Sequence, residues 1–129
     1  MSRRHNEHQQ RQQAVAALGR TLSRRARSAC ELCEGTDGTQ PMEVEPVFES
    51  PDVQRAVLAC ARCRALPTAK RLSDEAASLR FLEQTVWSET LPAQLMAVRL
   101  VRQLAAADIG WARDCAEGLW LDEAVEALI

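Results

Sequence analysis

Two cysteine motifs, Cys30-Glu31-Leu32-Cys33 and Cys60-Ala61-Arg62-Cys63, are separated by 26 residues in this chain. Each CxxC pair can wrap one side of a metal ion, and two such pairs complete a tetrahedron of four thiolates. Zinc suits such a set because it tolerates the geometry and does no redox chemistry. The spacing therefore predicts a structural zinc site, and its ligands are Cys30, Cys33, Cys60 and Cys63.

Rubredoxin-type iron is an alternative occupant, because it binds to similar cysteine pairs. Such iron sites usually have glycine after the second cysteine of each pair, whereas this chain has Glu34 and Arg64 there. A pair of dithiol redox centres is a weaker alternative. Zinc remains the cofactor that the motifs favour.

The residues between the motifs indicate two short strands. Residues 42–45 alternate in polarity and stop at Pro46, and residues 55–59 lead directly into Cys60. Two short strands between two cysteine pairs are what a zinc ribbon or a treble clef requires. Aromatic residues make up only 4% of the chain, so alanine and leucine must fill most of the core, which favours helices elsewhere.

The expected fold is therefore α+β and mainly α, with a small zinc-ribbon or treble-clef-like β element, flanking helices and a C-terminal helical part. We expect three regions along the chain. Residues 1–10 are a polar, disordered tail. Residues 11–67 contain an N-terminal helix, over 11–26, and the zinc ribbon. Residues 68–129 form a helical region packed on the ribbon, with helices at 73–84, 91–107, 111–118 and 122–128.

Three features of the helical region carry predictions about packing. The 91–107 helix has apolar residues on more than one side, so neighbouring helices or a second subunit must cover it, and a homodimer is possible. Trp87 is expected to be a core or interface anchor, because a ring of that size dominates local packing. Cys115 stands alone in a helical stretch and is expected to be a small buried apolar residue.

Charge is arranged in blocks along the chain, although the net charge is only −2. Residues 1–29 hold seven arginines and one glutamate, and residues 30–52 hold seven acids and no base. We expect these blocks mainly to neutralise each other. Binding to nucleic acid would then be weak, non-specific and dependent on salt, through Arg20, Arg24, Arg25 and Arg27; an unknown protein partner is the alternative.

The sequence offers little support for catalysis. A closed four-cysteine shell leaves no position for water on the metal. HNH nucleases carry a catalytic histidine on the strand between two cysteine pairs, but residues 42–45 contain none. The chain also has no apolar run of membrane-spanning length and no apolar segment of a signal peptide near its start, so a cytoplasmic protein with reduced thiols is expected.

Several segments resemble the bacterial PhnA-like proteins, a family named after an alkylphosphonate utilisation operon. They are Leu22-Ser23-Arg24-Arg25 before the first cysteine motif, the second motif itself, Val86-Trp87-Ser88-Glu89 with Pro92, and Leu119-Trp120-Leu121-Asp122-Glu123. The resemblance covers residues 18–128 and implies a zinc ribbon protein. It departs from the family at residues 78–82, where an aromatic-rich segment is usual.

Three functional hypotheses follow. The first is a non-enzymatic zinc-stabilised module that binds a protein or a nucleic acid. The second is a small hydrolase linked to phosphonate metabolism, which the family name and the many arginines suggest. The third is a structural homodimer built on the 91–107 helix.

Overall fold

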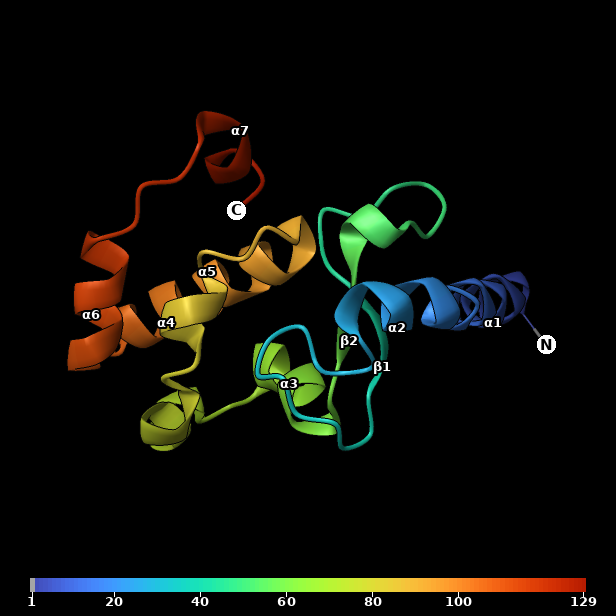
Figure 1. Cartoon of the computed structure of the whole chain (residues 1–129). Coiled ribbons are helices and arrows are strands. Elements are labelled where there is room, and N and C mark those ends of the chain that lie inside the picture. The colour runs from blue at the N-terminus through green and yellow to red at the C-terminus, as the bar shows by residue number, and fades with distance from the viewer. Residues whose placement is uncertain (1) are drawn as a thin grey trace.

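The structure, a computed structural model, describes residues 2–129 and has the predicted α+β fold, with helices predominating. Its two strands form one antiparallel sheet near the N-terminal helices, and the remaining helices gather on the other side (Figure 1). The elements in chain order, with 3₁₀ helices labelled η, are α1 (Arg3–Ala16), α2 (Gly19–Ala26), β1 (Gln40–Glu43), η1 (Val53–Arg55), β2 (Ala56–Ala59), α3 (Ala61–Ala65), η2 (Leu66–Thr68), η3 (Leu72–Leu79), α4 (Leu82–Thr85), α5 (Leu91–Ala106), α6 (Gly110–Glu117) and α7 (Glu123–Glu126).

The two strands lie close to where the sequence predicts them. Gln40 of β1 pairs with Ala59 of β2, and Glu43 pairs with Ala56. All four residues of β2 are buried, whereas β1 is exposed or half-buried. Since β2 ends at Ala59, the strand delivers Cys60 to the first turn of α3.

The N-terminal helix differs from its prediction in two ways. It begins at Arg3 rather than at Arg11. Ser2 caps this start by accepting a hydrogen bond from the backbone N–H of His5 at 3.2 Å. Residues 3–10 are therefore helical and not the disordered tail that their polar composition predicted. Hydrophobic periodicity missed them because they carry no apolar stripe.

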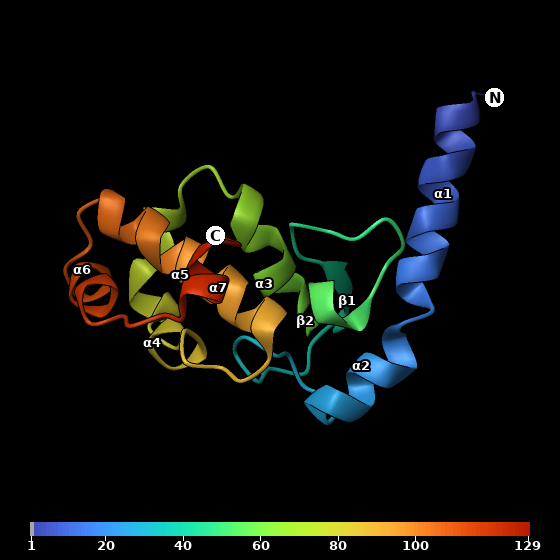
Figure 2. The same cartoon turned by 90° about the horizontal axis from the view of Figure 1, so that it is seen from above.

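The second difference is a break in the predicted 11–26 helix at residues 17 and 18. The break lets α2 turn from the line of α1, so that Leu22 is fully buried against Ala56 and Leu58 of β2. Figure 2 shows the result: α1 extends away from the body of the molecule, with α2 at its base. In a single straight helix, either Leu22 would lose its contacts with β2 or α1 would lose its contacts with β1.

The predicted 73–84 helix is instead the 3₁₀ helix η3 followed by the short helix α4. Leu79 and Leu82 are fully buried, as predicted. Side chains three residues apart align in a 3₁₀ helix, so Ala76 and Leu79 of η3 face the core together.

Helix α5 lies at the centre of the helical region and packs against α4, α6 and β2. Pro92 stands in its first turn, as predicted, and nine of its residues are buried on several faces. The chain's own neighbouring elements therefore cover α5. Burial of this helix does not require a second subunit.

One hydrophobic core joins the sheet, the cysteine motifs and α5, so the two regions predicted to meet at residue 68 share a continuous interior. Trp87 is not part of it: 53% of its surface is exposed. Leu82 of α4 and Val86 at its C-cap, four residues apart, both point into the core. Trp87, the residue after Val86, therefore points outward. The prediction that Trp87 anchors the core is therefore wrong, whereas an interface role for this exposed ring stays a prediction. Among residues 2–129, no helix is long and apolar enough to cross a membrane.

Candidate metal centre

The four predicted ligands come together in the fold. The sulfurs of Cys30, Cys33, Cys60 and Cys63 all lie within 4.8 Å of one another. Cys33 Sγ and Cys60 Sγ are 3.6 Å apart, too far for a disulfide, and all the cysteines are free thiols. Zn–S bonds of about 2.3 Å in a tetrahedron place the sulfurs about 3.8 Å apart, so the cluster has the size of a metal site.

The first cysteine pair is held in a tight turn between α2 and β1. The Cys30 N–H donates to the carbonyl of Gly35 at 2.7 Å, and the Glu34 N–H donates to the carbonyl of Cys30 at 2.9 Å. The Gly35 N–H points to Cys33 Sγ at 3.4 Å. Glu34 has φ of 68°, a left-handed conformation that glycine adopts at lower cost, so this turn holds a non-glycine residue under strain.

The second pair lies at the start of α3. Cys60 is the N-cap residue, and its sulfur accepts from the backbone N–H of Cys63 at 3.4 Å. The Cys60 sulfur thus satisfies one of the backbone N–H groups left free at the helix start. Cys63 in the same turn is fully buried.

Two neighbouring side chains hold the first cysteine pair against the rest of the protein. Glu31 accepts two hydrogen bonds from Arg25, both at 2.8 Å, and one from the backbone N–H of Leu58 at 2.9 Å. The Thr85 hydroxyl donates to the carbonyl of Leu32 at 2.6 Å and is buried. Glu31 thus ties the cysteine turn to β2, and Thr85 ties it to α4.

The thiols in this cluster cannot all ionise independently. A hydrogen bond with Cys63 lowers the pKa of Cys30 to about 4, and the same contact raises the pKa of Cys63. Burial raises the pKa of Cys33. One thiolate therefore disfavours the next, and a divalent cation removes this conflict by neutralising the charge of the sulfurs.

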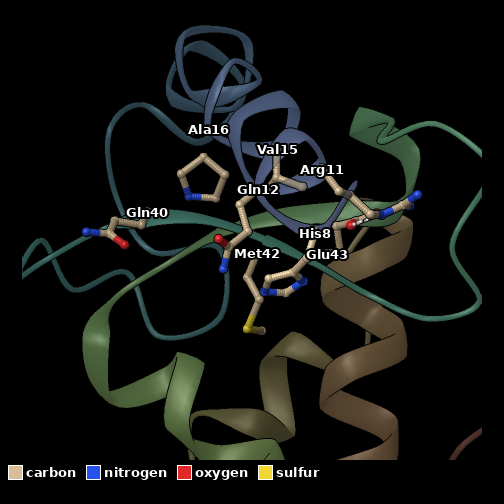
Figure 3. A pocket seen from close by; sticks show the side chains of 9 residues that line it. His8, Arg11, Gln12, Val15, Ala16, Gln40, Met42 and Glu43 are labelled. Atoms are coloured by element: carbon tan, nitrogen blue, oxygen red, sulfur yellow. Dashed lines mark hydrogen bonds and ion pairs between the residues drawn. The ribbon is translucent and has the colours of Figure 1, made fainter. Parts of the chain in front are cut away.

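The histidines of the N-terminal helix lie outside this cluster. His5 is exposed, and His8 lines a groove of about 720 Å³ between α1 and β1. Figure 3 shows Arg11 reaching from α1 to Glu43 beside this groove. Arg11 donates two hydrogen bonds to the Glu43 carboxylate, both at 2.7 Å.

Cys115 lies outside the cluster and is half-buried against the core rather than fully buried. Burial raises the pKa of its thiol, and the nearby charge of Glu83 adds to the effect. A raised pKa keeps the thiol protonated at neutral pH, which disfavours a nucleophilic role.

The four arginines predicted to contact nucleic acid do not share one environment. Arg25 is tied to Glu31 and also donates to the carbonyls of Val53 and Ala56 at 2.7 and 2.8 Å. Arg20, Arg24 and Arg27 are exposed, and none of them takes part in the ion pairs found among residues 2–129.

Sequence reasoning missed two supporting contacts of this site, Glu31 with Arg25 and Thr85 with Leu32. It also missed the contact of Arg11 with Glu43 that holds α1 to the body. The position of Glu31 between two ligands was a usable signal, because a charged residue inside a buried turn needs a partner. Nothing local marks Thr85, which lies 53 residues from its partner.

Comparisons with family models, with curated proteins and with solved structures find no match to this chain.

Proposed function

We propose that this chain is a PhnA-like protein in which Cys30, Cys33, Cys60 and Cys63 bind one structural zinc ion, and that it acts as a non-enzymatic binding or regulatory module. The observation that carries the proposal is the cluster of four sulfurs within 4.8 Å. Four thiolates at tetrahedral spacing are a donor set typical of structural zinc.

The order of the elements around the cluster supports a treble-clef-like site. A cysteine turn comes first, a two-stranded hairpin follows, and the last two cysteines lie at the start of a helix. Each half of the donor set is thus supplied by a local turn, and the hairpin brings the two halves together. The sequence segments that resemble the PhnA-like proteins are the basis for the family assignment.

A non-enzymatic role follows from the coordination chemistry. Four cysteine ligands complete the tetrahedron, so no position remains for a metal-bound water. Among residues 2–129, the four cysteines are the group of potential metal ligands that comes together. No specific contact favours the alternative of a hydrolase linked to phosphonate metabolism. A cytoplasmic location is part of the proposal, because the thiols bind metal only while reduced.

The test is metal analysis of purified protein. We expect one zinc per chain in the wild type, and a Cys60→Ser variant should lose zinc because serine is a poor ligand for it. Cys115→Ser removes a cysteine outside the cluster and is the matched control, so its zinc content should equal that of the wild type.

Two results would contradict the assignment. Full zinc occupancy in a Cys30→Ser/Cys60→Ser double variant would mean that other residues bind the ion. Stoichiometric iron in place of zinc, with the absorption of iron–thiolate bonds, would mean a rubredoxin-like centre.

A further inference from the structure

Helix α1 presents hydrogen-bond donors to solvent along almost its whole length. Residues 2–10 are all exposed, and α1 has no buried residue. Over residues 3–13 its side chains are arginine, histidine, asparagine and glutamine, with one acid, Glu7, which pairs with Arg3 at 3.3 Å. Such a helix has no apolar face to pack on another protein or to enter a membrane surface.

The helix is held to the body near its C-terminal half. Arg11 makes the two hydrogen bonds to Glu43 and donates two more, to the carbonyls of Glu49 and Phe48 at 2.8 and 2.9 Å. The hydrogen bonds and ion pairs found for residues 3–10 stay within α1 and its cap residue Ser2, and include no residue of the body. Residues 3–10 therefore project as an arm of fixed direction (Figure 2).

Helix α2 continues this basic surface at the base of the arm. Arg20 and Arg24, one helical turn apart, share a face of α2, and Arg27 follows at its C-terminal end. All three are exposed, and residues 1–29 contain no acid besides Glu7. The acids of residues 30–52 that could neutralise this region are partly engaged, since Glu31 binds Arg25 and Glu43 binds Arg11.

We propose that α1 is a DNA-binding arm that enters the major groove of duplex DNA, while Arg20, Arg24 and Arg27 of the neighbouring segment contact the phosphates. This names the partner of the module proposed above, and it rests on that proposal because the zinc site follows α2 directly and holds its end in place.

The dimensions and the side chains both favour duplex DNA. An α-helix with its side chains is about 10–12 Å across, and the major groove of B-DNA is about 12 Å wide. Arginine, asparagine and glutamine are the side chains that read base edges and contact phosphates. The major groove of double-stranded RNA is too deep and narrow for side chains to read.

The arm also corrects the surface predicted from sequence. Arg25 takes no part, because four hydrogen bonds occupy its guanidinium group. The exposed residue Arg4 joins the surface instead. Since the net charge of the chain is −2, affinity comes from this one region and should fall steeply with salt.

The test compares two variants that each lose four positive charges. The arm variant carries Arg4→Gln, Arg20→Gln, Arg24→Gln and Arg27→Gln. The control variant carries Lys70→Gln, Arg71→Gln, Arg80→Gln and Arg113→Gln, all exposed residues of the helical region. Binding to a labelled, mixed-sequence DNA duplex is followed by fluorescence anisotropy over a salt series, and zinc content and thermal unfolding are measured for each protein.

We expect the arm variant to lose at least about tenfold in affinity at low salt, with the slope of log affinity against log salt falling by about one for each phosphate contact removed. The control variant should keep most of the affinity and the slope. A Gln9→Pro variant, which breaks α1 within the arm, should also bind DNA more weakly while retaining zinc.

The inference is overturned if the arm variant binds the duplex as the wild type does, or if the control variant loses as much as the arm variant. It is also overturned if Gln9→Pro leaves affinity unchanged, or if the wild type prefers anionic phospholipid vesicles or double-stranded RNA to the DNA duplex. Zinc content separates the two proposals. A wild-type protein without zinc contradicts the proposed function. A wild-type protein that contains zinc but does not bind DNA contradicts only the proposal that α1 is a DNA-binding arm.

Discussion

At the scale of single residues, Glu31 explains why a charged residue stands inside the first cysteine motif. Its side chain is only 6% exposed, yet its carboxylate is bonded by Arg25 and by the backbone N–H of Leu58. The Glu31 N–H also donates to the Leu58 carbonyl at 2.8 Å. Glu31 therefore satisfies the backbone N–H and C=O of Leu58 on β2 and positions the neighbouring cysteines Cys30 and Cys33. Such contacts from residues next to the ligands orient a metal site.

Thr85 performs the corresponding task on the side of the helical region. Replacing it by valine keeps the shape of the side chain but leaves the buried carbonyl of Leu32 without its short hydrogen bond. We expect Thr85→Val to lower the free energy of unfolding by about 1–3 kcal/mol, the usual cost of an unsatisfied buried polar group. The zinc affinity should fall as well, because Leu32 lies between two ligands.

Chemical denaturation and competition with a zinc-binding dye measure these two effects. Thr68→Val is the matched control, since Thr68 is exposed and makes only a weak contact of 3.5 Å with the Ala65 carbonyl. Equal stability of Thr85→Val and the wild type would show that the Leu32 carbonyl finds another donor, and that Thr85 does not support the site.

At the scale of elements, α1 depends on one anchor. The 14-residue helix buries no side chain, and isolated helices of that length are marginal in water. Its strongest links to the body are the hydrogen bonds of Arg11 to Glu43 and to two carbonyls of the 46–52 loop.

We expect Arg11→Gln to release α1 from the body and to increase the rate of amide hydrogen exchange throughout residues 3–16. Exchange in α5 should stay slow, because that helix is packed on several sides. Arg4→Gln on the same helix is the control, since Arg4 is exposed and makes no side-chain hydrogen bond or ion pair to the body within residues 2–129. Exchange that is equally slow in Arg11→Gln would mean that α1 is held by contacts other than this anchor.

At the scale of the whole molecule, the cluster of four cysteines belongs to the main core. Cys30, Cys60 and Cys63 are buried in the same cluster as Leu79 and the inner residues of α5. The sheet itself has only two strands of four residues each, too small to be stable in isolation. Loss of a bound metal should therefore destabilise the helical region as well as the sheet.

We expect removal of zinc by a strong chelator to lower the unfolding temperature of the whole chain and to broaden its transition. The reason is that metal binding contributes folding free energy, of the order of 10 kcal/mol for structural zinc sites. Circular dichroism at a helical wavelength, recorded with and without chelator, measures the change. Restoring zinc should restore the original curve, and an unchanged curve after complete metal removal would contradict a structural role.

The sequence by itself determined the features that depend on residues close together along the chain. The CxxC spacing identifies the four cysteines that meet in the structure, and short polarity patterns locate β1 and β2 to within a few residues. The helix at Leu91–Ala106 follows from its apolar periodicity and from Pro92 in its first turn. These signals are local because each arises within one turn or one strand.

Only the tertiary structure decided which charges pair and which large side chains are buried. Glu43 accepts hydrogen bonds from Arg11, 32 residues away, and Thr85 donates one to the Leu32 carbonyl, 53 residues away. The break before α2 occurs where Leu22 can reach β2, and Trp87 turns outward because Val86 and Leu82 fill the core. Each of these outcomes depends on the free energy of contacts between segments distant in the chain, and no local pattern of residues records those contacts.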